Sequence, residues 1–193
     1  MISYSPRFYA PLVVAQILAW GGMFALWVFG YLHIRSALHL DEADAIRWMG
    51  VGMALYVALG AALNFALPEM YRRLGLVRTH AAALLCGGVG LVLVAHALSP
   101  CTLLLGYAVT SLGWASLSNT PYALVSARVT DGRYALAMAR FNLSVIAPQV
   151  ILALALSWLI ARVAPATAIF DGGIAMILGS MVMLAVPEAP TRS

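Results

Sequence analysis

The segment from His80 to Ala127, HAAALLCGGVGLVLVAHALSPCTLLLGYAVTSLGWASLSNTPYALVSA, contains no Asp, Glu, Lys or Arg. A helix crosses a bilayer with about 20 apolar residues, so this segment is too long for one span. Ser99-Pro100 supplies the break, because proline donates no backbone N–H and cannot continue a helix. The segment therefore predicts two transmembrane helices, at 80–98 and 101–126.

Charged residues and prolines divide the rest of the chain in the same way. They predict four further spans, at 8–32, 48–67, 140–161 and 168–186. The stretch that opens the first span is too long for the apolar core of a signal peptide and lacks a small-residue cleavage pattern. We therefore expect an all-α membrane protein in which residues 1–193 form a single bundle of six transmembrane helices.

The composition supports the same class of protein. Hydrophobic residues make up 63% of the chain and charged residues only 9%, whereas soluble domains carry roughly a quarter charged residues. A soluble fold of this composition would have no polar coat, so the lipid bilayer is the expected partner of much of its surface. Nucleic acid is not an expected partner, because the arginines are scattered through short connections.

The arginines of the connections also predict an orientation. If the six spans are correct, eight arginines lie on the side that holds both termini and three lie on the other side. The eight are Arg7, Arg72, Arg73, Arg78, Arg128, Arg133, Arg140 and Arg192, and the three are Arg35, Arg47 and Arg162. Because cytoplasmic loops carry an excess of basic residues, we expect both termini in the cytoplasm and the protein in the inner cell membrane.

Polar residues inside hydrocarbon normally face the bundle interior or a water-filled cavity. In the fourth span one arc of the helix carries Thr110, Ser111, Trp114, Ser118 and Tyr122. Trp114 and Tyr122 are candidates for a solute site, because their size prevents close packing of helices. The hydroxyls of Thr110 and Ser111 fit close helix packing equally well.

In the fifth span Asn142 and Gln149 are seven residues apart and therefore lie on one side, with Pro148 between them. Carboxamides both donate and accept hydrogen bonds, which suits the hydroxyl groups of a sugar or another polyol. They could also tie helices together.

The first span places Gln16, Trp20, Phe24 and Trp27 on one face at helical spacing. An aromatic wall beside an amide can hold the apolar face of a sugar ring while the amide binds its hydroxyls. A lipid-facing or core stripe would show the same pattern. Gln16 and Trp20 are candidate solute ligands, and Asn64 in the second span is a weaker one.

Several chemical groups are missing from the spans. The only acidic residue within them is Asp171, three residues after the start of the last span, so no acid lies in the middle of a span, where a coupling proton is usually carried. The histidines fall near helix ends without metal-ligand spacing, and they are His33, His39, His80 and His96. No phosphate-binding loop, nucleophile elbow or zinc-protease motif occurs. We therefore expect no enzyme activity, no metal and no cofactor.

Two stretches together resemble a known family. Ser111-Leu-Gly-Trp114-Ala-Ser-Leu-Ser-Asn119-Thr-Pro121-Tyr122-Ala-Leu-Val-Ser126 and Phe141-Asn142-Leu-Ser-Val-Ile-Ala-Pro148-Gln149 are similar to the tenth and eleventh helices of sucrose and maltose type transporters. These transporters belong to the major facilitator superfamily, close to the glycoside-pentoside-hexuronide symporters. Gln16 to Trp27 resembles the family's seventh helix, and Arg73-Leu-Gly75-Leu-Val-Arg78 resembles its cytoplasmic loop motif between helices eight and nine.

The resemblance covers the second six helices of a twelve-helix family. It implies the carboxyl-terminal half of an alternating-access sugar transporter, and it adds Asn119 to the candidate ligands. The acid that such symporters use for coupling would lie in the other half. The expected partner is therefore a second six-helix half, on a separate chain or in a second copy of this one. The alternatives are a truncated transporter fragment or a membrane interaction protein that does not transport. No repeat of three helices within the six is visible at the level of residues.

Overall fold

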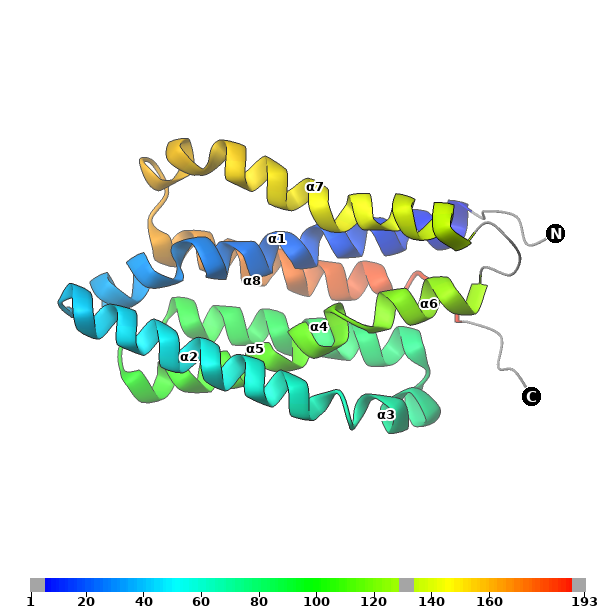
Figure 1. Ribbon diagram of the computed structural model, residues 1–193, viewed down its shortest axis with the longest axis horizontal. Coiled ribbons are helices and arrows are strands. Elements are labelled where there is room, and N and C mark those ends of the chain that lie inside the picture. The colour runs from blue at the N-terminus through cyan, green and yellow to red at the C-terminus, as the bar shows by residue number, and fades with distance from the viewer. Residues whose placement is uncertain (1–5, 129–133, 189–193) are drawn as a thin grey trace.

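The computed structural model describes residues 6–128 and 134–188, and in these ranges the chain forms helices and no strand (Figure 1). The helices are α1 (Pro6–Ala37), α2 (Glu42–Leu63), α3 (Leu67–Leu74), α4 (Leu76–Ala95), α5 (Pro100–Leu117), α6 (Thr120–Arg128), α7 (Tyr134–Ile160) and α8 (Pro165–Met183). Within the described residues, α5 and α6 together form one of six segments that are long and apolar enough to cross a membrane. The expected all-α, six-span membrane protein is confirmed.

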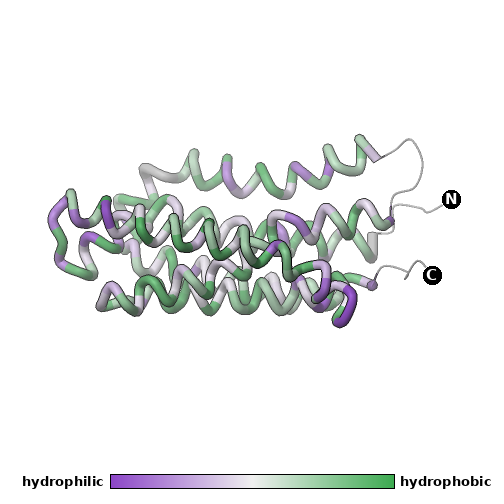
Figure 2. Tube along the Cα trace, turned by 60° about the horizontal axis from the view of Figure 1, so that its bottom comes forward, coloured by the Kyte–Doolittle hydropathy of each residue, from purple (hydrophilic) through white to green (hydrophobic). Residues whose placement is uncertain are grey.

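Hydrophilic residues gather at the two ends of the bundle, and hydrophobic residues follow the helices between them (Figure 2). The first and last described residues lie at the same end, as an even number of spans requires (Figure 1). We call this the terminal end of the bundle. The chain is a multi-pass membrane protein.

The helix boundaries follow local signals. Ser99 caps α5 through a reciprocal pair of bonds with Thr102, and Pro100 occupies the first turn, where a missing N–H is harmless. The break predicted at Ser99-Pro100 is therefore confirmed. The second span begins at Glu42, six residues before the predicted Trp48, because Asp41 Oδ1 accepts a hydrogen bond of 2.8 Å from the Asp44 N–H.

The fourth span is not the continuous helix predicted for residues 101–126. It is interrupted at Ser118-Asn119, between α5 and α6. Pro121 explains the interruption, since it has no N–H to give to the carbonyl one turn earlier. The Asn119 side chain compensates by donating from Nδ2 to the Ala115 carbonyl at 2.9 Å.

Four inner helices form the centre of the bundle: α1 packs on α8, α8 packs on α4, and α4 packs on α5. Glycines stand where these helices meet. A Cβ atom at Gly22 of α1 would overlap the carbonyl of Gly172 on α8, and one at Gly88 of α4 would overlap that of Gly173. Small residues let helix backbones approach closely, which is how helices attract one another in lipid. The inner helices are therefore held by backbone proximity.

Two flanking helices, α2 and α7, complete the bundle. α2 packs on α5, and α7 packs mainly on α1. The first three spans are α1, α2 and α4, and the last three are α5 with α6, α7 and α8. The two sets make matching contacts: α1 packs on α8 as α5 packs on α4, and α2 packs on α5 as α7 packs on α1. Because each unit has three spans, the two units cross the membrane in opposite directions. The pairing of the helices thus has the pattern of an inverted repeat, which individual residues do not reveal.

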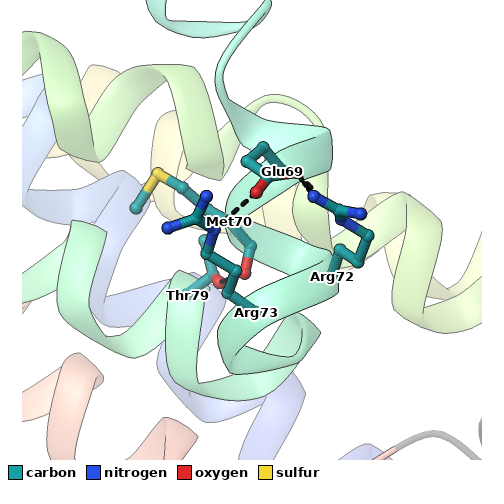
Figure 3. A network of polar contacts seen from close by, with 5 residues as sticks. All are labelled: Glu69, Met70, Arg72, Arg73 and Thr79. Carbon is teal, nitrogen blue, oxygen red and sulfur yellow. Dashed lines mark hydrogen bonds and ion pairs between the residues drawn. The ribbon is translucent and has the colours of Figure 1, made fainter.

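The short helix α3 lies at the terminal end of the bundle and is held to its surroundings by polar contacts (Figure 3). Within α3, Glu69 pairs with both Arg72 and Arg73. The Thr79 hydroxyl of α4 donates to the Met70 carbonyl at 3.2 Å. The ion pairs lie within α3 itself, while the Thr79–Met70 bond fixes α3 against the first turn of α4.

The last described residues are tied to the same end of the bundle. The Glu188 carboxylate accepts hydrogen bonds of 3.4 Å from the Val77 and Arg78 N–H groups in the first turn of α4. Arg128 of α6 donates from Nη2 to the Pro187 carbonyl at 2.6 Å, and its guanidinium lies 4.5 Å from the centre of the Phe8 ring. The Glu188 carboxylate therefore supplies both hydrogen-bond acceptors and negative charge at the amino terminus of α4.

Candidate functional site

An aromatic cluster joins α1, α2 and α5 inside the bundle. On α1 the ring centres of Trp20 and Trp27 are 6.2 Å apart, and those of Phe24 and Trp27 are 5.1 Å apart. Between α2 and α5 the ring centres of Tyr56 and Trp114 are 5.2 Å apart. We call these five residues the aromatic cluster. It brings the sequence candidates Trp20 and Trp114 into one packed core.

Buried polar atoms without hydrogen bonds accompany the aromatic cluster. Among the described residues, Trp20 Nε1 and Gln16 Oε1 have no hydrogen-bond partner, and Gln16 is 0% exposed. The Trp27 indole and the Tyr56 hydroxyl are neighbours, but they do not complete a hydrogen bond. A buried polar group without a partner costs roughly 1–3 kcal/mol, so groups of this kind mark places where water or a ligand can bind.

Gln16 is held from one side by a histidine. Its Nε2 lies 3.0 Å from Nε2 of His80 on α4, and the two residues are both 0% exposed. His80 Nδ1 lies 2.9 Å from the Ser116 hydroxyl on α5. The sequence places His80 near a helix end, whereas the structure places it one turn inside α4 with side-chain partners on two other helices.

The polar contacts continue from Ser116 toward the terminal end of the bundle. Ser116 Oγ lies 2.7 Å from Thr120 Oγ1 on α6, and Thr120 Oγ1 lies 2.7 Å from the Tyr71 hydroxyl on α3. Gln16, His80, Ser116, Thr120 and Tyr71 therefore form one polar chain. Burial raises the pKa of Tyr71, so this last member keeps its proton at neutral pH.

Asn64 and Asn119 pair with each other away from the aromatic cluster. Asn119 Nδ2 donates to Asn64 Oδ1 at 3.0 Å, which joins the end of α2 to the break between α5 and α6. Asn119 also caps the end of α5, as described above. Both amides therefore have structural partners in this conformation.

Tyr122 and Asn142 form a second pair, between α6 and α7. The Tyr122 hydroxyl donates to Asn142 Oδ1 at 3.2 Å, and the Tyr122 ring packs edge-on against Phe141 at 5.2 Å. Gln149, two turns farther along α7, is half-buried and has no hydrogen bond to another described residue. The break at Ser118-Asn119 thus turns Tyr122 toward α7, while Trp114 packs against α2.

The candidates therefore fall into separate groups. Gln16, Trp20 and Trp114 meet in or beside the aromatic cluster, while the other candidates lie along α2, α6 and α7. Sequence reasoning missed Tyr56 and the partners of Gln16. The available signal for Tyr56 was a phenol in the middle of an otherwise apolar span, where its hydroxyl needs a partner.

The described residues contain no group of three or more His, Cys, Asp and Glu side chains that could hold a metal ion. No protein-family model matches the sequence, and no curated protein matches it. The functional class therefore has to be inferred from the residues of this chain.

Proposed function

We propose that this chain is one six-helix half of an alternating-access transporter of the major facilitator type, and that it carries a small polar solute of the sugar class. The solute binds beside the aromatic cluster, and a second six-helix unit closes the site from the other side. That unit is a separate chain or a second copy of this one.

The observation that carries this proposal is the set of buried polar atoms without partners next to aromatic rings that pack edge-on or tilted against one another. Trp20 Nε1 can donate and Gln16 Oε1 can accept, and the Tyr56 hydroxyl can do either. A sugar presents hydroxyls that both donate and accept, and its ring has apolar faces that pack on indole and phenol rings. A sugar therefore matches both the polar and the aromatic part of this region.

The arrangement of the helices supports the same proposal. Inverted repeats of three helices are common in secondary transporters, whose solute sites lie at the interface of the repeats. The flanking helices α2 and α7 leave wide apolar faces uncovered by the rest of the described chain. A second unit that packs there would also come close to Asn142 and Gln149, which completes the ligand set expected from the sequence.

The orientation follows from charge. Of the arginines used for the prediction, Arg133 and Arg192 lie outside the described residues, and no side-chain geometry is described for Arg7. Five described arginine side chains lie at the terminal end, those of Arg72, Arg73, Arg78, Arg128 and Arg140, and three lie at the opposite end, those of Arg35, Arg47 and Arg162. Positive-inside statistics place the terminal end in the cytoplasm of a cell whose inner membrane holds the protein.

Binding of maltose to the purified protein, measured as stabilisation against heat, tests the site. We expect maltose to raise the unfolding temperature of the wild type, and Trp20→Ala to reduce the affinity at least tenfold. Trp158→Ala is the matched control, because Trp158 of α7 is 55% exposed and lies outside the aromatic cluster. If neither maltose nor other disaccharides stabilise the wild type, the sugar assignment is wrong.

Uptake of radiolabelled maltose into proteoliposomes tests transport. The vesicles contain the chain together with whatever second unit co-purifies in mild detergent. We expect Asn142→Ala and Gln149→Ala to lower uptake several-fold more than Trp158→Ala does. A strict monomer without co-purifying unit, ligand stabilisation or uptake would favour the alternative function, a membrane interaction protein that does not transport.

A further inference from the structure

The hydrogens of the polar chain can be assigned one by one, because the Gln16 atom that faces His80 is the amide nitrogen, which can only donate. An amide nitrogen has no acceptor site, so Gln16 Nε2 donates to His80 Nε2, and this ring nitrogen carries no proton. The neutral imidazole then carries its proton on Nδ1, which donates to Ser116 Oγ. The two contacts of His80 thereby select one tautomer.

The remaining hydroxyls follow from this start. Ser116 accepts from His80, and its own hydrogen is free to be donated to Thr120 at 2.7 Å. Thr120 can in turn donate to the Tyr71 hydroxyl, whose oxygen lies 2.7 Å from Thr120 Oγ1. Tyr71 is half-buried and outside the membrane spans, so its hydrogen can reach water. In this assignment every hydrogen of the polar chain points from Gln16 toward the terminal end.

The reverse direction changes what Gln16 presents. If Ser116 donated to Nδ1, the ring proton would sit on Nε2, and only the Gln16 oxygen could accept it. The amide would then be turned over, with its nitrogen where Oε1 now lies. Oε1 is buried without a partner and lies one turn of α1 from Trp20. The direction of the hydrogen bonds therefore decides whether Gln16 offers the solute an acceptor or a donor at this position.

We propose that His80 is a positioning residue, which holds the Gln16 carboxamide with its oxygen available to the solute and so selects solutes that donate a hydrogen bond there. The proposal rests on the proposed function for the solute, but the geometry of His80 is independent of it. Ser116, Thr120 and Tyr71 maintain the orientation from the terminal end.

The ring protons can be observed directly by nitrogen NMR of the full chain with labelled histidine in lipid nanodiscs. We expect His80 to carry its proton on Nδ1. Two other histidines calibrate the spectrum: His33 Nε2 lies 2.8 Å from the Val94 carbonyl and must be protonated there, while His96 Nδ1 lies 2.9 Å from the Val92 carbonyl. A wild-type His80 with its proton on Nε2 would overturn the proposal, and no variant is needed for that result.

The variant Ser116→Ala removes the acceptor of the His80 proton. We expect the major tautomer to invert, from Nδ1–H to Nε2–H, as Gln16 turns over to accept. Ser180→Ala is the matched control, because the Ser180 hydroxyl donates only to the Ile177 carbonyl of its own helix, at 2.7 Å. An unchanged His80 tautomer in Ser116→Ala contradicts the assigned direction.

A second readout uses maltose analogues in which each hydroxyl in turn is replaced by fluorine, which cannot donate. One analogue should bind the wild type at least tenfold more weakly than maltose, because it leaves the Gln16 oxygen without a donor. In Ser116→Ala this difference should fall below threefold. Equal discrimination in both proteins would refute the selective role. If maltose itself does not bind, the solute class fails, while the NMR result still decides the positioning of Gln16.

Discussion

Helices α4 and α7 have nearly the same mean hydropathy over their most apolar stretches, 1.7 and 1.5, but 61% of that stretch is buried within the chain in α4 and only 22% in α7. The difference lies in residue size. α4 carries Gly87, Gly88 and Gly90 against its neighbours, whereas α7 directs Leu143 and Leu154 outward. For these two helices hydropathy is nearly the same, while the glycines of α4 let the other helices of this chain surround it.

The largest expected effect comes from filling a close contact between inner helices. Gly22→Ala should destabilise the protein by about 3 kcal/mol, because the new Cβ meets the backbone of Gly172, which cannot rotate away. Gly50→Ala on the flanking helix α2 meets open space and should stabilise by about 0.5 kcal/mol through lower backbone entropy. Thermal unfolding in detergent measures both, and equal shifts would remove the distinction between inner and flanking helices.

A pair of leucines tests the same distinction by deletion. Leu84 of α4 is 0% exposed and Leu154 of α7 is 81% exposed. Leu84→Ala should cost about 2 kcal/mol, mainly for the cavity, since lipid tails are as apolar as leucine. Leu154→Ala should leave the unfolding temperature of the isolated chain unchanged. A loss of uptake in Leu154→Ala without a loss of stability would indicate that a protein unit, rather than lipid, covers α7.

The smallest effect concerns two arginines at opposite ends of the bundle. Arg128 contacts the Phe8 ring and donates to the last described residues, whereas Arg162 lies over the exposed Trp158 ring. We expect Arg128→Gln to lower stability by about 1 kcal/mol and Arg162→Gln by less than half of that. A larger effect of Arg162→Gln would show that the flanking helix contributes more to the fold than its burial indicates.

The sequence predicted the six spans because charge and proline interrupt apolar stretches wherever the chain leaves the membrane. It did not predict the break before Pro121. A proline in the first turn of a new helix and a proline inside a continuous helix look the same in the sequence, unless the residue at which the preceding helix ends is known. The break matters for the candidate site, because it directs Tyr122 toward α7 and Asn119 toward α2.

The contacts of the candidate site could be predicted only in part. Gln16 and Trp20 lie on one face of α1, and Trp114 lies on the polar face of α5; periodicity within each helix can identify these faces. The structure brings the three residues together in or beside the aromatic cluster. The contact of Gln16 with His80 joins residues 64 positions apart, so it depends on which helices become neighbours. Periodicity within one helix contains no information about that choice. The inverted repeat is hidden for the same reason, because it exists in the pairing of helices and not in their residues.

The capping of α4 by Glu188 also implies an order of biosynthesis. Val77 and Glu188 are 111 residues apart, so at typical rates of translation about 5 to 20 s separate their synthesis. During that interval the Glu188 carboxylate is not available to cap the amino end of α4. The glycines of α1 and α4 that pack against α8 also have no partner yet. The terminal end of the bundle is thus completed late, after most of its helices have left the ribosome.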